Sequence, residues 1–392
     1  MLEQCLAGSP PKVLPRTLLH DPTGQALFGV LAEGLADRFE PALCDAYVRL
    51  FSQAVAHAME DTEPASLVAR YERVRRVRAV QGKPRRVFVL SRVTLGADVA
   101  VTSVLLAAAK RRFPHADVVF VGPAKNRELF VADPHVHHAP VEYLRGSLSQ
   151  RLSTWNDLHD ILSAEDCVVL DSDSRLTQLG LLPVCAEERY HLFESRSYGA
   201  ETALSLPELA TAWAAETLGV EGAMPYLALG RKVKMQPYVA VSLGVGENPA
   251  KRLPDPFEPQ LLKMLAARGL ALAIDKGAGG EEARRVERAV ETAQVSATFW
   301  DGSFAGFASL IAGSRLYVGY DSAGQHVAAA SGVPLISVFA GFPAPRMFDR
   351  WRPVAPQATV IRVDQPDVEA TLARIAEAIP KALNPSETVV KG

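Results

Sequence analysis

Three side chains that can do chemistry, Asp321, Ser322 and His326, lie within one short stretch of the sequence. They open the segment DSAGQHVAAASGVP, which follows the apolar run RLYVGY and precedes the apolar run LISVF. Both apolar runs have the composition of buried strands, and the small residues between them predict a helix that ends near SGVP. The sequence therefore places the three polar groups at the first turn of a helix between two parallel strands.

The first turn of such a helix is suited to binding phosphate, because it presents unpaired backbone N–H groups and the positive end of the helix dipole. The small residues Ala323 and Gly324 let a diphosphate approach the backbone, and Ser322 can donate a hydroxyl hydrogen bond. His326 can donate to a phosphate or ribose oxygen, whereas Asp321 should cap the helix or accept from a sugar hydroxyl. The alternative is an ordinary N-cap with a buried core histidine, and the local pattern leaves both open.

The surrounding sequence predicts two successive domains built on parallel β-sheets. Apolar strand-like runs alternate with helical segments from residue 86, and the same alternation restarts at residue 237. Such runs are typical of parallel strands covered on both faces, so we expect an α/β fold of two Rossmann-like, doubly wound domains. The first 82 residues contain no clear strand and are expected to form a helical extension. The predicted boundaries are 1–82, 83–230 and 231–392, with the interdomain linker at 228–236.

Ligands are expected at the carboxyl ends of the strands. In open parallel sheets a ligand binds beyond these ends. Two such domains that face each other form a cleft between their strand ends, and we expect the chemistry there.

Composition excludes some classes of function. The chain has 392 residues and a formal net charge of −2, which argues against a globally basic nucleic-acid-binding protein. No apolar run approaches the length of a bilayer span, and MLEQCLAGSPPK lacks the features of a secretory signal, so we expect a cytoplasmic protein. The four cysteines show no CxxC pairing and are interpreted as reduced and structural.

Positive charge is concentrated in ARYERVRRVRAVQGKPRR, residues 69–86. Apolar residues recur there at helical spacing and leave the arginines on the opposite helix face. We interpret this face either as a solvated surface or as a contact with an anion, which is an acceptor or the inner face of a membrane bound by Arg73, Arg75 and Arg76.

Three stretches together resemble the heptosyltransferase-like glycosyltransferases of family 9, which have the GT-B fold. They are YDSAGQHVAAASGVPLISVF, FAGFASLIAGSRLYVG before it, and GADVAVTSVLLAAAKRRFP at the start of the first sheet. The resemblance spans about residues 86–365. It implies an inverting, metal-independent transferase without a cofactor, which moves a sugar such as heptose from a nucleoside diphosphate sugar to a hydroxyl of a glycan or glycolipid. The family's usual acceptors belong to lipopolysaccharide cores or related surface glycans.

Three further residues match positions with roles in that family. Asp98 aligns with its general base, which takes a proton from the acceptor hydroxyl, and is also a good N-cap for a helix starting at Val99. Lys251 matches a lysine on the donor phosphate, where an ammonium group neutralises the diphosphate leaving group. Glu281 matches a glutamate on the donor ribose. The alternatives are a surface lysine and an ordinary glutamate in a first helical turn. The family's signature turn implies further donor contacts from Asp321, Ser322, Ala323, Gly324 and His326.

The sequence also departs from the family pattern. Ala97 separates Gly96 from Asp98, which can move the carboxylate, and Ala323 stands where the family usually has glycine. AGFPAPRMF replaces a Gly-Pro-Thr-type turn, so a hydroxyl contact to the donor phosphate is missing, and Arg346 and Arg350 are candidates to replace it. These departures keep open a non-catalytic protein that binds the nucleotide sugar. The role of the first 82 residues, as dimerisation or acceptor-docking segment, stays open as well.

The sequence indicates two other enzyme classes more weakly. Gly244 and Gly246 after one strand, with Asp275 after the next, suggest an NAD-dependent oxidoreductase, but a third glycine is absent and prolines follow where the phosphate-binding helix should begin. The triplet Asp171-Ser172-Asp173 suggests a metal-dependent transferase, but the second sheet domain has no place in that fold. We expect its loop to lie at the mouth of the cleft instead.

A metal site at the histidines is not expected. His135, His137 and His138 lack partners at metal-ligand spacing and are predicted to lie in an exposed loop.

Overall fold

The computed structural model describes residues 1–59, 62–230, 238–246 and 248–384. They form two compact units. Unit 1 comprises Met1–Arg127, Asp133–Pro225 and Pro343–Trp351, and unit 2 comprises Glu128–Ala132, Tyr226–Phe342 and the chain from Arg352. Most of the predicted linker, from residue 231 onward, lies outside the described residues.

Unit 1 contains a five-stranded parallel sheet in the order β3-β2-β1-β4-β5. Its strands are mainly apolar and buried on both faces, except for the edge strand β3, which is largely half-buried or exposed. The order reverses between β1 and β4, where Leu90 pairs with Asp171 at the strand ends. The strands are β1(Arg86–Leu90), β2(Asp117–Gly122), β3(Val136–Pro140), β4(Cys167–Asp171) and β5(Tyr190–Leu192).

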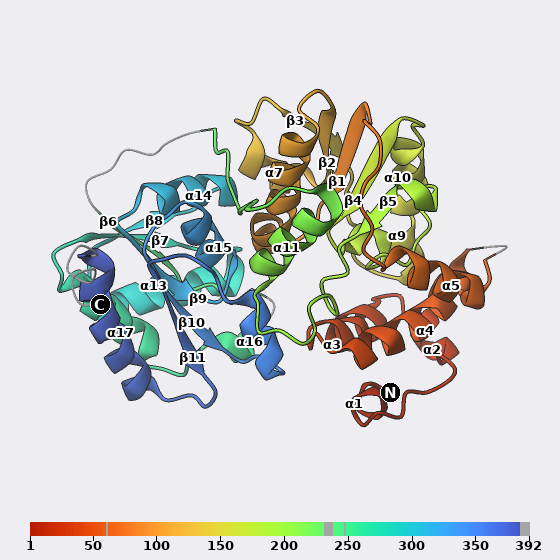
Figure 1. Ribbon diagram of the computed structural model, residues 1–392. Helices are drawn as coiled ribbons and strands as arrows, with labels where there is room; N and C mark the ends of the chain where they lie inside the picture. Colours follow the sequence, from red (N-terminus) through yellow and green to blue (C-terminus); the bar gives the residue numbers. More distant parts are fainter. Residues whose placement is uncertain (60–61, 231–237, 247, 385–392) are drawn as a thin grey trace. The chain divides into compact units, whose positions relative to one another are not determined.

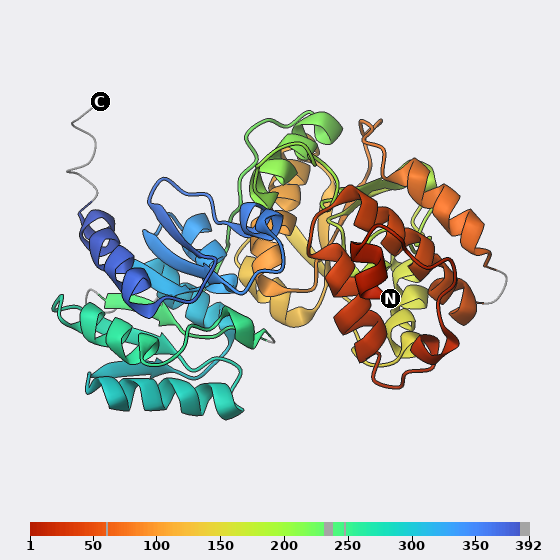
Figure 2. The same ribbon diagram turned by 90° about the horizontal axis from the view of Figure 1, so that it is seen from below.

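The N-terminal helices share the core of unit 1. Phe51 and Tyr71 belong to the same apolar cluster as the strand residues Phe88, Val121 and Val169. Figures 1 and 2 show these red helices beside the sheet, with α4 against α9. The first 82 residues therefore contribute a layer to the first domain. The helices are α1(Leu2–Leu6), α2(Arg16–Leu19), the π-helix η1(Gln25–Ala32), α3(Glu33–Ala36), α4(Pro41–Ala58) and α5(Pro64–Val74).

The remaining helices of unit 1 lie between or after the strands. α7 packs on β1 and β2 and against α11, and α9 and α10 contribute to the core that the N-terminal helices share. A late segment of the chain, α16, returns to this unit. Their bounds are α7(Ser103–Arg112), α9(Leu148–Leu152), α10(Thr154–Leu162), α11(Leu206–Leu218) and α16(Pro345–Trp351).

Unit 2 contains a six-stranded parallel sheet in the order β11-β10-β9-β6-β7-β8 (Figure 1). This is the doubly wound order, with the reversal between β6 and β9. The strands are β6(Tyr238–Ser242), β7(Ala271–Asp275), β8(Ala297–Trp300), β9(Leu316–Tyr320), β10(Leu335–Ala340) and β11(Ala358–Val363).

Helices cover both faces of the second sheet. The core of one face joins residues of α12, α13 and α17 to β6, β7, β9, β10 and β11, whereas α14 and α15 pack together with α15 on β9 and β10. The helices are α12(Phe257–Ala266), α13(Gly280–Ala293), α14(Phe304–Gly313), α15(Ala323–Ala330) and α17(Val368–Leu383). The predicted fold class, two Rossmann-like α/β domains with an N-terminal helical segment, is confirmed.

Two local predictions are wrong. His137 and His138 lie on the edge strand β3, where the His138 ring contacts the Gly122 carbonyl at 2.9 Å, and not in a loop. The first helical turn after β1 begins at Leu95 with Thr94 as N-cap, so Asp98 is not the N-cap of a helix starting at Val99.

Within the described residues no helix has the length and apolar character needed to cross a bilayer.

Candidate functional site

In unit 2 the polar residues gather where the strand order reverses. Lys251 follows β6 and Asp321 follows β9, and the Lys251 Nζ donates to Asp321 Oδ2 at 2.7 Å and to its backbone carbonyl at 3.2 Å. Two of the three ammonium hydrogens are used in this way, which leaves one for a ligand. The structure thus brings together two of the predicted donor-binding residues.

Gln325 was not predicted, yet it fixes the position of Asp321. Its Nε2 donates to Asp321 Oδ1, and its Oε1 accepts from Ser337 Oγ at 2.6 Å, on β10. The Gln325 side chain is fully buried. Its place within the DSAGQH turn was the only sequence signal, because a glutamine between Gly324 and His326 has no distinctive chemistry of its own.

The first turn of α15 carries the remaining predicted residues. Ser322 is the N-cap, and its hydroxyl lies 3.3 Å from the Tyr317 hydroxyl instead of capping the helix. His326 is 5 % exposed, and burial lowers the pKa of its imidazole to about 4, so the ring is neutral at pH 7. A neutral ring retains one N–H that can donate to an oxygen.

Gly324 is required by packing as well as by any ligand. A Cβ at this position would lie 2.4 Å from the Tyr317 hydroxyl and 2.7 Å from its ring. The adjacent Ala323 is the first residue of α15. Gly324 therefore allows Tyr317 to pack against the turn, and Ala323 adds only a methyl group beside its backbone N–H groups.

The glutamate that faces the strand ends is Glu282, not its neighbour. Glu281 is exposed and pairs with Arg284 at 3.0 Å and Arg288 at 2.7 Å along its own helix, α13. Glu282 instead accepts from the Ala278 N–H at 2.8 Å and lies against Gly244. Two adjacent glutamates carry the same local signal, so the sequence could not distinguish them.

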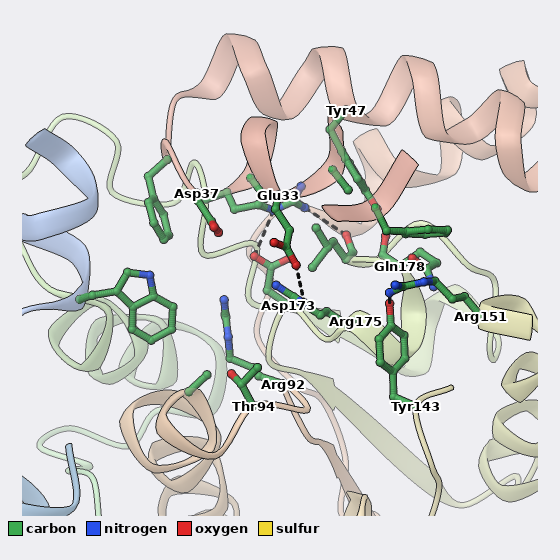
Figure 3. A pocket seen from close by; sticks show the side chains of 18 residues that line it. Glu33, Asp37, Tyr47, Arg92, Thr94, Tyr143, Arg151, Asp173, Arg175 and Gln178 are labelled. Carbon is green, nitrogen blue, oxygen red and sulfur yellow. Dashed lines mark hydrogen bonds and ion pairs between the residues drawn. The ribbon is translucent and has the colours of Figure 1, made fainter. Parts of the chain in front are cut away.

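Unit 1 contains a pocket at the reversal of its own sheet (Figure 3). It encloses about 700 Å³, counted with the solvent at its mouth. Arg92 and Thr94 reach it from the end of β1, Asp173 and Arg175 from the end of β4, and Arg196 from the chain after β5. The loop after β4 therefore lines a pocket of unit 1, at the strand end where a ligand of a parallel sheet is expected.

The N-terminal segment and α16 complete this pocket. Glu33 and Asp37 come from α3 and the residue that follows it, Tyr47 from α4, and Trp351 from the end of α16. The Glu33 carboxylate accepts from Arg175 Nη1 at 3.0 Å. Arg92 lies 5.8 Å from the Trp351 ring centre. These contacts join residues 142 and 259 positions apart, which no local sequence pattern could predict.

Asp98 does not line the pocket, whereas Ala97 does. The Asp98 side chain has no exposed surface. Its carboxylate accepts four hydrogen bonds, from Ser91 Oγ at 2.6 Å, the Arg92 N–H at 2.7 Å, Thr102 Oγ1 at 2.6 Å and Asn126 Nδ2 at 2.5 Å. Burial raises the pKa of this carboxyl, and the hydrogen bonds act in the opposite direction. The Asp98 carboxylate therefore lies in the domain interior, and its neighbour Ala97 stands at the pocket wall.

The other candidates have structural partners. Arg350 is 1 % exposed and donates to the carbonyls of Gly199, Thr202 and Leu204, and Arg346 donates to that of Phe39, so both guanidinium groups have backbone partners within unit 1. Among the residues that the structure describes, no three His, Cys, Asp or Glu side chains gather where they could hold a metal ion.

The two carboxylates of the triplet Asp171-Ser172-Asp173 also have hydrogen-bond or ion-pair partners within the protein. Asp171 accepts from Thr177 Oγ1 at 2.6 Å and from the Tyr190 hydroxyl. Asp173 pairs with Arg196 at 3.1 Å. Asp171 is therefore a structural acid of the strand end, and only Asp173 borders the pocket.

Comparisons with known proteins agree with this architecture. Residues 183–374 match the model of glycosyltransferase family 9 (heptosyltransferase). A glycosyl transferase family 9 structure from Veillonella parvula DSM 2008 has 14% identity and a TM-score of 0.57, covering 80% of this chain and 94% of that one. No curated protein sequence matches the chain.

Two Escherichia coli structures are also similar. ADP-heptose lps heptosyltransferase II has 20% identity and a TM-score of 0.58 over 77% of this chain and 100% of its own. Heptosyltransferase WaaC with ADP has 18% identity and a TM-score of 0.57 over 75% of this chain and 99% of its own. At these identities the likeness establishes the shared GT-B fold, and the family match confirms the resemblance found in the sequence.

Proposed function

We propose that this chain, which belongs to glycosyltransferase family 9 through its residues 183–374, moves a sugar from a nucleoside diphosphate sugar to a hydroxyl of a glycan or glycolipid. The observation that carries the donor assignment is the contact of Lys251 with Asp321 across the strand-order reversal of unit 2, beside the first turn of α15. An ammonium group and uncovered backbone N–H groups converge there, and both favour a diphosphate.

The reaction is an inverting displacement at the anomeric carbon. The acceptor oxygen forms a bond to this carbon as the bond to the diphosphate oxygen breaks, and the acceptor proton passes to a base. Lys251 and the N–H groups of α15 stabilise the charge that develops on the departing diphosphate, so this step needs no metal ion. Glu282, or Glu281 after a change of rotamer, would accept from the donor ribose.

The donor to test first is an ADP-linked heptose. Structures of Escherichia coli WaaC contain ADP and ADP-2-deoxy-2-fluoro heptose. Acceptors of lipopolysaccharide biosynthesis, presented at the inner face of the membrane, are the corresponding class. The relatives supply the donor and acceptor in this proposal, and the residues of unit 2 supply its physical basis.

A donor-binding protein without turnover is the second candidate, and the burial of Asp98 favours it. As general base, Asp98 would have to exchange at least one of its four hydrogen bonds for the acceptor hydroxyl. Slow release of ADP from ADP-heptose, measured without an acceptor, separates the candidates. Release that stops in Asp98→Asn supports the transferase with Asp98 as base, and binding without any release supports the silent protein.

The donor site itself is tested by titrating ADP into the full chain and into Lys251→Gln. Glutamine can still donate to Asp321 but carries no charge, so we expect ADP affinity to fall roughly ten- to a hundredfold. Lys263→Gln, on the exposed face of α12, is the matched control and should bind like the parent. Equal ADP affinity in all three proteins would remove the proposed donor site.

A further inference from the structure

A second pocket of unit 1 lies at the opposite end of its sheet, where the strands begin. It is lined by the loop before β1 and by residues at the starts of β4 and β5, and it encloses about 850 Å³, counted with the solvent at its mouth. This space is sufficient for a small polar molecule. The proposed transfer uses residues at the carboxyl ends of the strands, so it leaves this pocket without a role.

His191, on β5, presents an acceptor to the pocket. Its side chain is 5 % exposed, and burial lowers the pKa of the imidazole to about 4, so the ring is neutral at pH 7. A hydrogen bond to the Arg78 backbone raises this pKa, so the ring donates its one N–H to the Arg78 carbonyl. The other nitrogen, Nδ1, has no partner among the described residues. It therefore carries a lone pair that can accept from a donor.

Arg78 adds a donor to the same pocket. Its Nη2 donates to the carbonyls of Glu187 and, at 2.6 Å, of Tyr190, which fixes the guanidinium group. Its Nε is buried and has no partner within the described parts of the chain. A buried polar atom without a partner is costly in free energy. One such acceptor and one such donor therefore predict a ligand that supplies both a donor and an acceptor.

The charged side chains that line the pocket balance one another in number. Three are basic and three are acidic: Arg78, Lys83, Arg189, Glu165, Asp166 and Glu188. No two of them form an ion pair with each other in the described residues. A simple anion would be repelled by the carboxylates and a simple cation by the basic groups, whereas a molecule with both charges can pair with both sets.

We infer that this pocket binds a small zwitterion, which carries an ammonium group and either a carboxylate or a phosphate group. The ammonium group donates to His191 Nδ1 and pairs with the acidic side chains. The anionic group accepts from Arg78 Nε and pairs with Arg189 and Lys83. The pocket shares no lining residue with the pocket at the carboxyl ends of the strands, so the inference does not rest on the proposed transferase function.

The test uses two zwitterions, L-serine and phosphoethanolamine, and three analogues with a single kind of charge. Ethanolamine lacks the anionic group of both, 3-hydroxypropionate is serine without its amine, and ethyl phosphate is phosphoethanolamine without its amine. Binding to the full chain is followed by saturation-transfer NMR and by the unfolding midpoint. We expect one of the zwitterions to bind at least about tenfold more tightly than each of the three analogues.

Two variants test the residues that carry the inference. His191→Phe keeps a ring but removes the acceptor, and should lower the affinity for the zwitterion about tenfold. The double variant Lys83→Gln with Glu188→Gln removes one exposed charge of each sign, keeps the net charge and should lower the affinity about fivefold. Lys263→Gln with Glu291→Gln, both exposed in unit 2, is the matched control and should bind like the parent.

The tighter of the two zwitterions identifies the anionic group as a carboxylate or a phosphate. If ethyl phosphate or 3-hydroxypropionate binds as tightly as its zwitterion, the pocket is a site for simple anions, and if ethanolamine does, it is a site for cations. Either result overturns the inference. Absence of binding by both zwitterions also overturns it, as does an affinity that is unchanged in the double variant.

Discussion

At the scale of single residues, one additional residue, Ala97, distinguishes this chain from the Gly-Asp turn of the family that it resembles. The residue directly after Gly96 lines the pocket, and that residue is Ala97, while the next side chain, Asp98, points into the domain. Successive residues of a helix differ by about 100° in direction, so one added residue is enough to exchange a solvent-facing side chain for a buried one. The sequence showed the insertion, but its consequence depended on which side chain the turn buries.

Restoring a carboxylate at the pocket wall should raise turnover. In Ala97→Asp a carboxylate faces the pocket while Asp98 keeps its structural hydrogen bonds. General-base assistance contributes roughly a hundred- to ten-thousandfold, so we expect donor hydrolysis to rise by at least about tenfold. Ala97→Asn is the matched control, since it has nearly the same shape but no basic oxygen. Equal rates in parent, Ala97→Asp and Ala97→Asn would show that this position is not where a base acts.

The buried histidine of the donor site should make stability depend on pH. Burial lowers the pKa of His326 to about 4, below its ordinary value of 6.5, so the unfolded chain binds the proton first and stability is lost as pH falls from 6.5 towards 4. Relative to the parent, the free energy of unfolding of His326→Gln should therefore rise by about 3 kcal/mol between pH 7 and pH 4, as measured by urea unfolding. His115→Gln, on an exposed loop, should gain nothing, and a pH-independent difference for His326→Gln would contradict the burial argument.

At the scale of elements, the strands were predictable from the sequence, but the surface against which the N-terminal helices pack was not. Continuous apolar runs such as VFVL and VVFV read as buried parallel strands without any knowledge of their neighbours. The amphipathic pattern of α4 likewise predicted a helix, but its apolar face could have met a second copy, an acceptor or the sheet. Residues of α4 belong to the same apolar cluster as Phe88 and Val121 of the sheet, which makes α4 part of the core of this domain.

A cavity in α4 should consequently destabilise unit 1 itself. Phe51 is 1 % exposed, stacks on Tyr47 at 4.3 Å and meets Phe28 edge-on at 5.8 Å. Phe51→Ala should cost about 3–5 kcal/mol of unfolding free energy, measured by denaturant titration with Trp fluorescence. Phe299→Ala, 39 % exposed on β8 of unit 2, should cost far less. Similar costs for the two variants would mean that the N-terminal helices do not share the core.

At the scale of the whole molecule, the two units repeat one plan. Each sheet reverses its strand order once, and each reversal carries the polar residues of a candidate site, Arg92 and Asp173 in unit 1 and Lys251 and Asp321 in unit 2. The rule for ligands at strand ends predicts both positions from the element order alone. It could not predict that α16, late in the sequence, returns to unit 1 with Trp351, because long-range contacts leave no local pattern.

The distribution of charge over the whole chain argues against the membrane interpretation of the arginine-rich helix. Arg73 pairs with Glu187 at 2.7 Å, and Arg75 pairs with Asp45 at 2.8 Å and with Glu72 at 3.2 Å. Each basic residue near an acidic lipid surface adds about 1 kcal/mol of attraction, which neighbouring carboxylates offset. Joint replacement of Arg73, Arg75 and Arg76 by Gln should therefore leave sedimentation with phosphatidylserine vesicles unchanged. Replacement of Glu72 and Glu187 by Gln removes the offsetting charges and should increase sedimentation at low salt. If the arginine variant instead loses an association that the parent has, the helix contacts the membrane despite its ion pairs.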